Sequence, residues 1–297
     1  MKQQRSILIL LFLILPLGLA GIWRLQRSID AQFSALNEEQ DEVLLPSGKT
    51  MKLLSLEYAP LMADVYWTRV VQYYGDKRVR HEQNFESLWP LLELTTTLDP
   101  NLIPAYRFGS TFLSEAPPIG AGSPDRAIEL IERGIRGNPE YWRLYQDLGN
   151  VFYFSLHDVE RASEAYNQGS KIPGAAPWMK IMAARIAERG DTRGTSRLLW
   201  SEIYQSAQDA TVRENAKMHL ILLRTDDDKE QLDLLLAEYA KKHGHSAQNL
   251  QALVEAGLLP GIPVDPERFP YVVGKLGRAE LNPNSPIAKA EPLYRKF

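Results

Sequence analysis

A spaced pattern of four residues occurs three times along this chain and limits the folds that are open to it. Each copy has a small or apolar residue, an apolar residue four positions later, a small residue three positions after that, and a proline that closes the unit. The copies are Leu88, Leu92, Thr95 and Pro100; Ala127, Ile131, Gly134 and Pro139; and Ala162, Tyr166, Gly169 and Pro173. We therefore expect one small helical unit to be stacked at least three times.

The residues upstream of each copy predict the partner helix of the unit. In the third unit, aromatic and apolar residues recur at helical spacing, with a glycine where two helices would cross. These residues are Trp142, Tyr145, Leu148, Gly149, Phe152 and Tyr153. A fourth pair is built around Trp178, Ile181, Met182, Leu198 and Trp200. A degenerate fifth pair is predicted over residues 211–223 and 229–242, with Asp226, Asp227 and Asp228 capping its second helix.

The third unit resembles the tetratricopeptide repeat (TPR), whose 34 residues carry a Leu-Gly pair, small residues and a closing proline at fixed places. The matching positions are Tyr145, Leu148, Gly149, Phe152, Ala162, Tyr166, Gly169 and Pro173, with one residue inserted in the turn. The resemblance implies an all-α fold, a TPR-like α-solenoid of helix pairs. We divide the chain into a membrane segment (1–23), a stalk (24–52), helical repeats (53–256) and a Pro-rich tail (257–297).

The amino-terminal segment contains 17 uncharged residues, from Ile7 to Trp23, between Lys2 and Arg5 on one side and Arg24 on the other. A helix of this length is roughly 25 Å long and could span a locally thinned bilayer. We expect a single-pass signal anchor, and a signal peptide cleaved near Ala20 or a buried core helix stay open as alternatives. The flanking charges favour a cytoplasmic amino end, which would place the repeats in the periplasm of a bacterial inner membrane.

Composition excludes several classes of function. The net charge of −3 and the pI near 6.0 give no electrostatic reason to expect nucleic acid. The absence of cysteine removes disulfides, thiolate metal sites and cysteine nucleophiles. The five histidines lack metal-ligand spacing, and His243-Gly244-His245 is interpreted as a solvated helix end. We predict neither an enzyme nor a cofactor or metal site, although six Trp and thirteen Tyr leave a carbohydrate-binding role as a remote alternative.

Two further segments carry local predictions. The turn signal Leu45-Pro46-Ser47-Gly48 predicts a small hairpin near residues 44–54. Asp64 and Arg69 stand among apolar residues, so we expect an internal ion pair or cap, with a ligand-facing pair as the alternative.

The carboxyl-terminal segment is rich in proline, which helix interiors exclude. Residues 270–274 and 277–281 are expected to form a two-stranded hairpin. We interpret it as a cap on the last repeat, and a docking strand for a partner is the alternative.

A binding groove is expected on the first helix of each pair. The candidate residues are Gln72, Arg107, Thr111, Arg143, Gln146, Asn150, Tyr153 and Met179. Their amide, guanidinium and aromatic groups suit an extended peptide or protein segment, and an empty solvated groove stays open.

Short motifs along nearly the whole chain resemble a family of membrane-anchored bacterial TPR proteins of unassigned function. They include Leu45-Pro46-Ser47-Gly48, Leu61-Met62-Ala63-Asp64, Gln72-Tyr73-Tyr74-Gly75, Leu98-Asp99-Pro100, Pro173-Gly174-Ala175 and Ala256-Gly257. The resemblance implies a membrane-tethered scaffold that mediates protein–protein interactions in cell-envelope assembly. The alternative is a fixed structural subunit of a larger membrane complex, with no exchangeable ligand.

Overall fold

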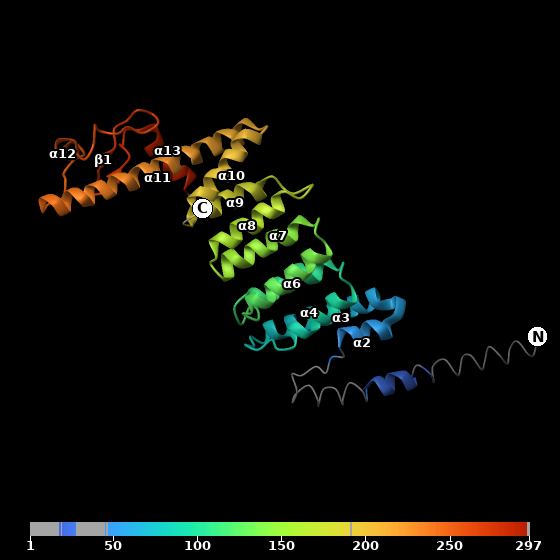
Figure 1. Cartoon of the computed structure of the whole chain (residues 1–297). Helices are drawn as coiled ribbons and strands as arrows, with labels where there is room; N and C mark the ends of the chain where they lie inside the picture. Colours follow the sequence, from blue (N-terminus) through green and yellow to red (C-terminus); the bar gives the residue numbers. More distant parts are fainter. Residues whose placement is uncertain (1–17, 19, 28–44, 46, 191, 296–297) are drawn as a thin grey trace, which may run out of the picture. The chain divides into compact units, whose positions relative to one another are not determined.

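The computed structural model describes residues 18, 20–27, 45, 47–190 and 192–295, and it is all-α apart from one small sheet. The chain divides into two compact units, residues 1–137 and 138–297, and each is described by itself (Figure 1). The predicted all-α class and the packing of successive helices are confirmed.

Unit 1 is a layer of helices in which each helix packs on the next (Figure 1). Its elements are α2 (Gly48–Ser55), the 3₁₀ turn η1 (Leu56–Tyr58), α3 (Ala59–Val79), α4 (Leu88–Leu98), α5 (Ile103–Ser114) and α6 (Pro124–Gly137). Helix α3 pairs with α4, and α5 pairs with α6, as the repeat pattern predicts.

The repeat positions of unit 1 form its core. Leu88, Leu92, Ala127 and Ile131 are all fully buried. Gly109 lets α5 approach its neighbours, because a Cβ there would lie 2.5 Å from Leu92 Cδ2 of α4. Small residues at helix crossings thus set the close packing that the sequence pattern encodes.

Unit 2 continues the pairs and ends in a mixed segment. Its elements are α7 (Trp142–Asn150), the π-helical turn η2 (Val151–Ser155), α8 (Val159–Ser170), α9 (Trp178–Arg189), α10 (Arg193–Ser206), α11 (Ala210–His243), α12 (Gln251–Glu255), β1 (Val272–Val273), β2 (Ala279–Glu280) and α13 (Pro286–Tyr294). Helices α7 and α8, and α9 and α10, form the third and fourth pairs.

The fourth pair repeats the third with an offset of 34 residues in its second helix. Ser196, Trp200 and Ile203 occupy the places of Ala162, Tyr166 and Gly169 and are buried like them. The hydroxyl of Ser196 donates to the carbonyl of Ala184 at 3.0 Å, so a polar residue is accepted at this core position.

The predicted fifth pair is wrong, because residues 210–243 form the single helix α11 of 34 residues. No glycine or proline interrupts this stretch. The three aspartates lie inside the helix instead of capping one. Asp226 pairs with Arg295 at 2.6 Å, Asp227 with Arg193 and Arg197, and Asp228 accepts from the hydroxyl of Tyr271 at 2.8 Å.

The carboxyl-terminal segment covers one side of α11, as the cap interpretation predicts. Strands β1 and β2 pair antiparallel, with Val272 opposite Glu280. Leu232, Leu236 and Tyr239 of α11 share a core with Tyr271, Leu281 and Ile287 of the cap. The backbone N–H of Ala279 donates to Asp233 Oδ1 at 2.6 Å and ties β2 to the helix. The helix ends at His243, with exposed Gly244 in the left-handed conformation, as expected for a solvated helix end.

Two local predictions near the amino end are wrong. Residues 48–55 form helix α2 instead of a hairpin strand, and its N-cap Ser47 Oγ accepts from the N–H of Thr50 at 3.2 Å. Asp64 and Arg69 are both exposed on α3, so they form no internal ion pair. Arg69 lies instead over the ring of Tyr66, 5.3 Å from its centroid.

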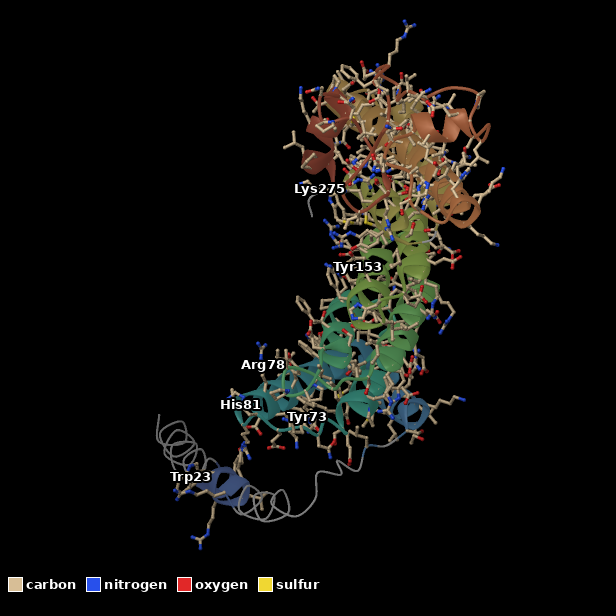
Figure 2. The ribbon with its side chains drawn as sticks, turned by 90° about the vertical axis from the view of Figure 1, so that its left-hand side faces the viewer. Trp23, Tyr73, Arg78, His81, Tyr153 and Lys275 are labelled. Atoms are coloured by element: carbon tan, nitrogen blue, oxygen red, sulfur yellow. The ribbon has the colours of Figure 1, made fainter. Side chains whose placement is uncertain are left out.

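Most of the predicted membrane segment (1–23) and much of the stalk lie outside the described residues. Residues 20–27 are helical, and Figure 2 labels Trp23 on this helix. No helix among residues 18, 20–27, 45, 47–190 and 192–295 combines the length and apolar character that a membrane crossing requires.

Candidate functional site

A strip of polar and aromatic side chains on α7 and η2 forms the candidate site of unit 2. Arg143 is exposed on α7, whereas Gln146, Asn150 and Tyr153 are half-buried. Figure 2 labels Tyr153, whose side chain lies at the edge of the unit 2 helices. The strip contains the π-helical turn η2, a rare conformation that is often found at functional sites.

Hydrogen bonds join the strip to the two helices beside it. The Tyr166 hydroxyl of α8 donates to Asn150 Oδ1 at 2.6 Å. Arg189 Nη1 of α9 donates to the Tyr153 hydroxyl at 2.7 Å. The side chains that would meet a ligand are thus held in place by neighbours from both adjoining helices.

The hydrogen bond from Tyr166 also determines which group of Asn150 is available to a ligand. Burial, reinforced by the carboxylate of Asp147, raises the pKa of Tyr166 to about 12. The hydroxyl therefore stays protonated near neutral pH and donates to the amide oxygen of Asn150. The Nδ2 hydrogens of Asn150 are then the groups that this side chain presents to an acceptor, such as a peptide carbonyl.

Aromatic rings border the polar groups. The Arg143 guanidinium lies 4.3 Å from the ring centroid of Trp142, and Trp142 meets Trp178 edge to face at 6.0 Å. Phe154 is 68% exposed and meets the ring of Tyr153 edge to face. Exposed rings next to fixed hydrogen-bonding groups provide both contact area and direction for a bound chain.

Met179 does not belong to the groove, and this prediction is wrong. Its side chain is fully buried, and its Cε lies 2.6 Å from where a Cβ of Gly169 would be. An offset of 35 residues places Met179 at the core position of Leu144, which is equally buried. With the same offset, Trp178 corresponds to Arg143 and Arg185 corresponds to Asn150. The exposed position on α9 is therefore Trp178, one residue before the predicted Met179.

Arg189 is a site residue that the sequence pattern did not single out. It lies at the carboxyl end of α9, 36 residues after the tyrosine that it contacts. The repeat offset, applied to Phe154, would have pointed to this position.

The three candidates in unit 1 lie on α3 and α5 and form a set of their own. Gln72 and Thr111 are exposed, and Arg107 is half-buried. The Thr111 hydroxyl donates to the backbone carbonyl of Arg107 at 3.3 Å.

Each unit also contains a pocket away from these strips. The pocket of unit 1 has a volume of about 650 Å³ and is lined by residues of α2, α4, α5 and α6, among them Lys49, Glu93, Tyr106 and Arg133. Arg133 pairs with Glu93 at 3.4 Å, so the two charges offset each other. One pocket of unit 2, of about 390 Å³, lies between α9, α10 and the start of α11, and another, of about 440 Å³, lies between α11 and the turn of the hairpin.

Among the residues that the structure describes, no group of three or more His, Asp or Glu side chains could hold a metal ion. A comparison with models of known protein families found no match, and a search of curated proteins found no relative.

Proposed function

We propose that this chain is a TPR-type scaffold, tethered to the bacterial inner membrane by its amino-terminal segment, that binds an extended segment of a cell-envelope protein. The repeat positions support the TPR assignment. Residues with the spacing of Ala162 and Tyr166 are buried in four successive second helices, and glycines occupy the crossings at Gly109, Gly149 and Gly169.

The observation that carries the binding role is the strip with Arg143, Asn150 and Tyr153, together with Arg189 of α9, which donates to the Tyr153 hydroxyl. An extended peptide needs hydrogen-bonding groups along its backbone and a few apolar anchors. Asn150 and Arg189 supply fixed polar groups, and the exposed ring of Phe154 supplies an anchor. The proposal includes no catalysis, no cofactor and no nucleic-acid partner.

Tethering and location rest on the sequence. The uncharged run from Ile7 to Trp23 has the composition of a signal anchor, and the flanking Lys2 and Arg5 favour a cytoplasmic amino end. The repeats then lie in the periplasm, where envelope proteins are within reach.

Site-specific photo-cross-linking in intact cells tests the proposal. A photoreactive residue at Arg143 should capture one or a few envelope proteins, and the double substitution Tyr153→Ala with Arg189→Ala should reduce that capture strongly. The matched control is the same probe at Glu164, an exposed residue of α8. Equal capture from Arg143 and Glu164 would contradict a binding strip.

The same experiment separates the scaffold from a fixed subunit of a larger complex. A scaffold gives substoichiometric partners that exchange when a competitor is expressed. A fixed subunit gives one neighbour, in constant ratio, that does not exchange.

A further inference from the structure

One end of unit 1 exposes large apolar side chains in close succession. Leu53, Leu54, Leu56, Tyr58 and Leu61 are exposed by 75%, 68%, 76%, 69% and 58%. They belong to α2, η1 and the first turn of α3, and Figure 1 shows α2 at the end of unit 1 away from α6. We call these five residues the leucine edge. Contiguous exposed apolar residues of this kind mark an interaction surface.

The packing beneath the leucine edge is inverted relative to a soluble helix. The buried residues of the same segment are small, namely Ser55, Ala59 and Ala63, while the large apolar residues face outward. Helices in lipid follow this arrangement, because small residues let helices approach and large apolar residues meet the acyl chains. A water-exposed helix would place its leucines on the packed side.

The backbone holds one of the leucines outward. Leu56 has φ 48° and ψ −127°, a conformation that non-glycine residues rarely adopt. It ends α2 and turns the chain into η1 with its side chain in solvent. Strain of this kind is retained where a site requires it.

The amino-acid composition of the leucine edge favours lipid over protein as its binding partner. Contact centres between proteins are rich in Trp, Tyr and Arg and poor in Leu, whereas four of the five residues here are Leu. Exposed Lys49 and Lys52 precede them on α2, and Tyr58 lies among them. Lysines beside an apolar edge, with a tyrosine at the boundary, are typical of segments that lie in the interface of an anionic bilayer, and the single Glu57 only partly offsets the two lysines.

We propose that the leucine edge inserts into the headgroup region of an anionic lipid bilayer, so that unit 1 lies on the membrane surface. The inference deepens the proposed function and rests on its membrane tether. Insertion would hold the first helix pair at the bilayer, instead of leaving the repeats free on a stalk.

Fluorescence of single labelled residues tests the insertion. The chain has no cysteine, so Leu56→Cys and Leu276→Cys each create one labelling site for the fluorophore NBD in the full-length protein. Leu276 is the matched control, because it is 87% exposed and lies in the turn between β1 and β2. Each protein is reconstituted into vesicles of phosphatidylcholine and phosphatidylglycerol, and flotation with the vesicles is measured separately.

The proposal expects a blue-shifted emission at Leu56 that spin-labelled lipids quench, and a water-like emission at Leu276. Adding Leu54→Glu and Leu61→Glu to the Leu56 probe should abolish the shift, while far-UV circular dichroism stays unchanged because both leucines are exposed. If these two substitutions also abolish flotation, the leucine edge itself binds the bilayer and the amino-terminal tether fails.

Three results overturn the inference. If the protein floats with the vesicles but the probe at Leu56 has a water-like emission, the tether is retained and the insertion is refuted. A blue shift that lipid quenchers do not reduce means that protein, such as a second copy of this chain, covers the edge instead of lipid. If the protein does not float and the probe at Leu56 has a water-like emission, both the insertion and the tether are refuted.

Discussion

At the scale of single residues, the close packing of helices depends on glycine, which has no side chain. A Cβ added to Gly149 would lie 2.6 Å from Cδ2 of Tyr166 and 3.4 Å from the backbone carbonyl of Ala162. The ring of Tyr166 is buried and its hydroxyl is bonded to Asn150, so it has little freedom to move away. Close crossing of α7 and α8 therefore requires glycine at this position.

We predict that Gly149→Ala lowers the free energy of unfolding by about 1–2 kcal/mol. Overpacking costs about 1–3 kcal/mol, and the better helix propensity of alanine offsets part of it. The matched control is Gly75→Ala inside α3, where no atom of a neighbouring element lies within 4 Å of the added Cβ. The control should gain about 0.5–1 kcal/mol. Denaturant unfolding measures both, and stabilisation by Gly149→Ala would refute the packing argument.

Asp158 predicts a pH dependence. It caps α8 by accepting from the backbone N–H of Arg161 at 2.9 Å, and this bond, together with the Arg161 side chain, lowers the pKa of Asp158. The stabilisation is therefore present above the unfolded pKa of about 3.9 and is lost as pH falls through the lower folded value. Asp158→Asn keeps an acceptor without the charge. In thermal unfolding, the variant should be less stable than the parent near pH 7, and the difference should vanish near about pH 2. A difference that persists in acid would contradict this assignment.

At the scale of elements, the carboxyl-terminal half of the long helix α11 is buried against the cap. This half places Leu232, Leu236 and Tyr239 against the cap, and the buried Ile287 of α13 belongs to the same core. Arg295, at the end of α13, pairs with Asp226 of α11 at 2.6 Å.

We predict that Ile287→Ala lowers stability by about 2–5 kcal/mol through loss of buried apolar contact. Amide hydrogen exchange should rise in residues 225–243 and in the cap, and should not rise in α7 and α8. Leu276→Ala is the control, since this exposed leucine contributes little burial. Unchanged exchange in α11 would mean that the cap does not support the helix.

The sequence predicts the helix pairs well where small residues mark the crossings, as at Gly109 and Gly149. It fails where the structure depends on partners far along the chain. The three aspartates of α11 resemble a cap locally, but each has a partner far along the chain: Arg295 for Asp226, Arg193 and Arg197 for Asp227, and the Tyr271 hydroxyl for Asp228.

The candidate site is predicted in part for a similar reason. The strip on α7 follows from repeat spacing, whereas a shift of one residue on α9 moved the prediction from an exposed position to the buried Met179. In the sequence, the leucine edge is a dense apolar block of the kind that other elements usually cover, yet the structure exposes it. Its exposure follows from the small residues Ser55 and Ala59 taking the packed side, which periodicity alone does not reveal.

At the scale of the whole molecule, each of the two units contains a core of its own. In unit 1, Leu92 and Ile131 are fully buried, and in unit 2, Trp200 and Leu222 are. Stacked repeats draw their stability mainly from nearest neighbours. Damage in one unit should therefore stay within it.

We predict that Leu92→Ala lowers the stability of unit 1 by about 2–5 kcal/mol. Amide exchange should rise in α3 to α6 and stay unchanged in α9 to α11. Exchange that rises equally in α11 would instead indicate one cooperative unit.

The covered face of α11 also limits how copies of this chain can assemble. Head-to-tail growth of a helical array needs an open apolar face at both ends, so that each added molecule extends the stack. The hairpin, α12 and α13 cover that face in unit 2, so a further helix pair cannot pack on it. Head-to-tail stacking of copies through this face of α11 is thereby blocked.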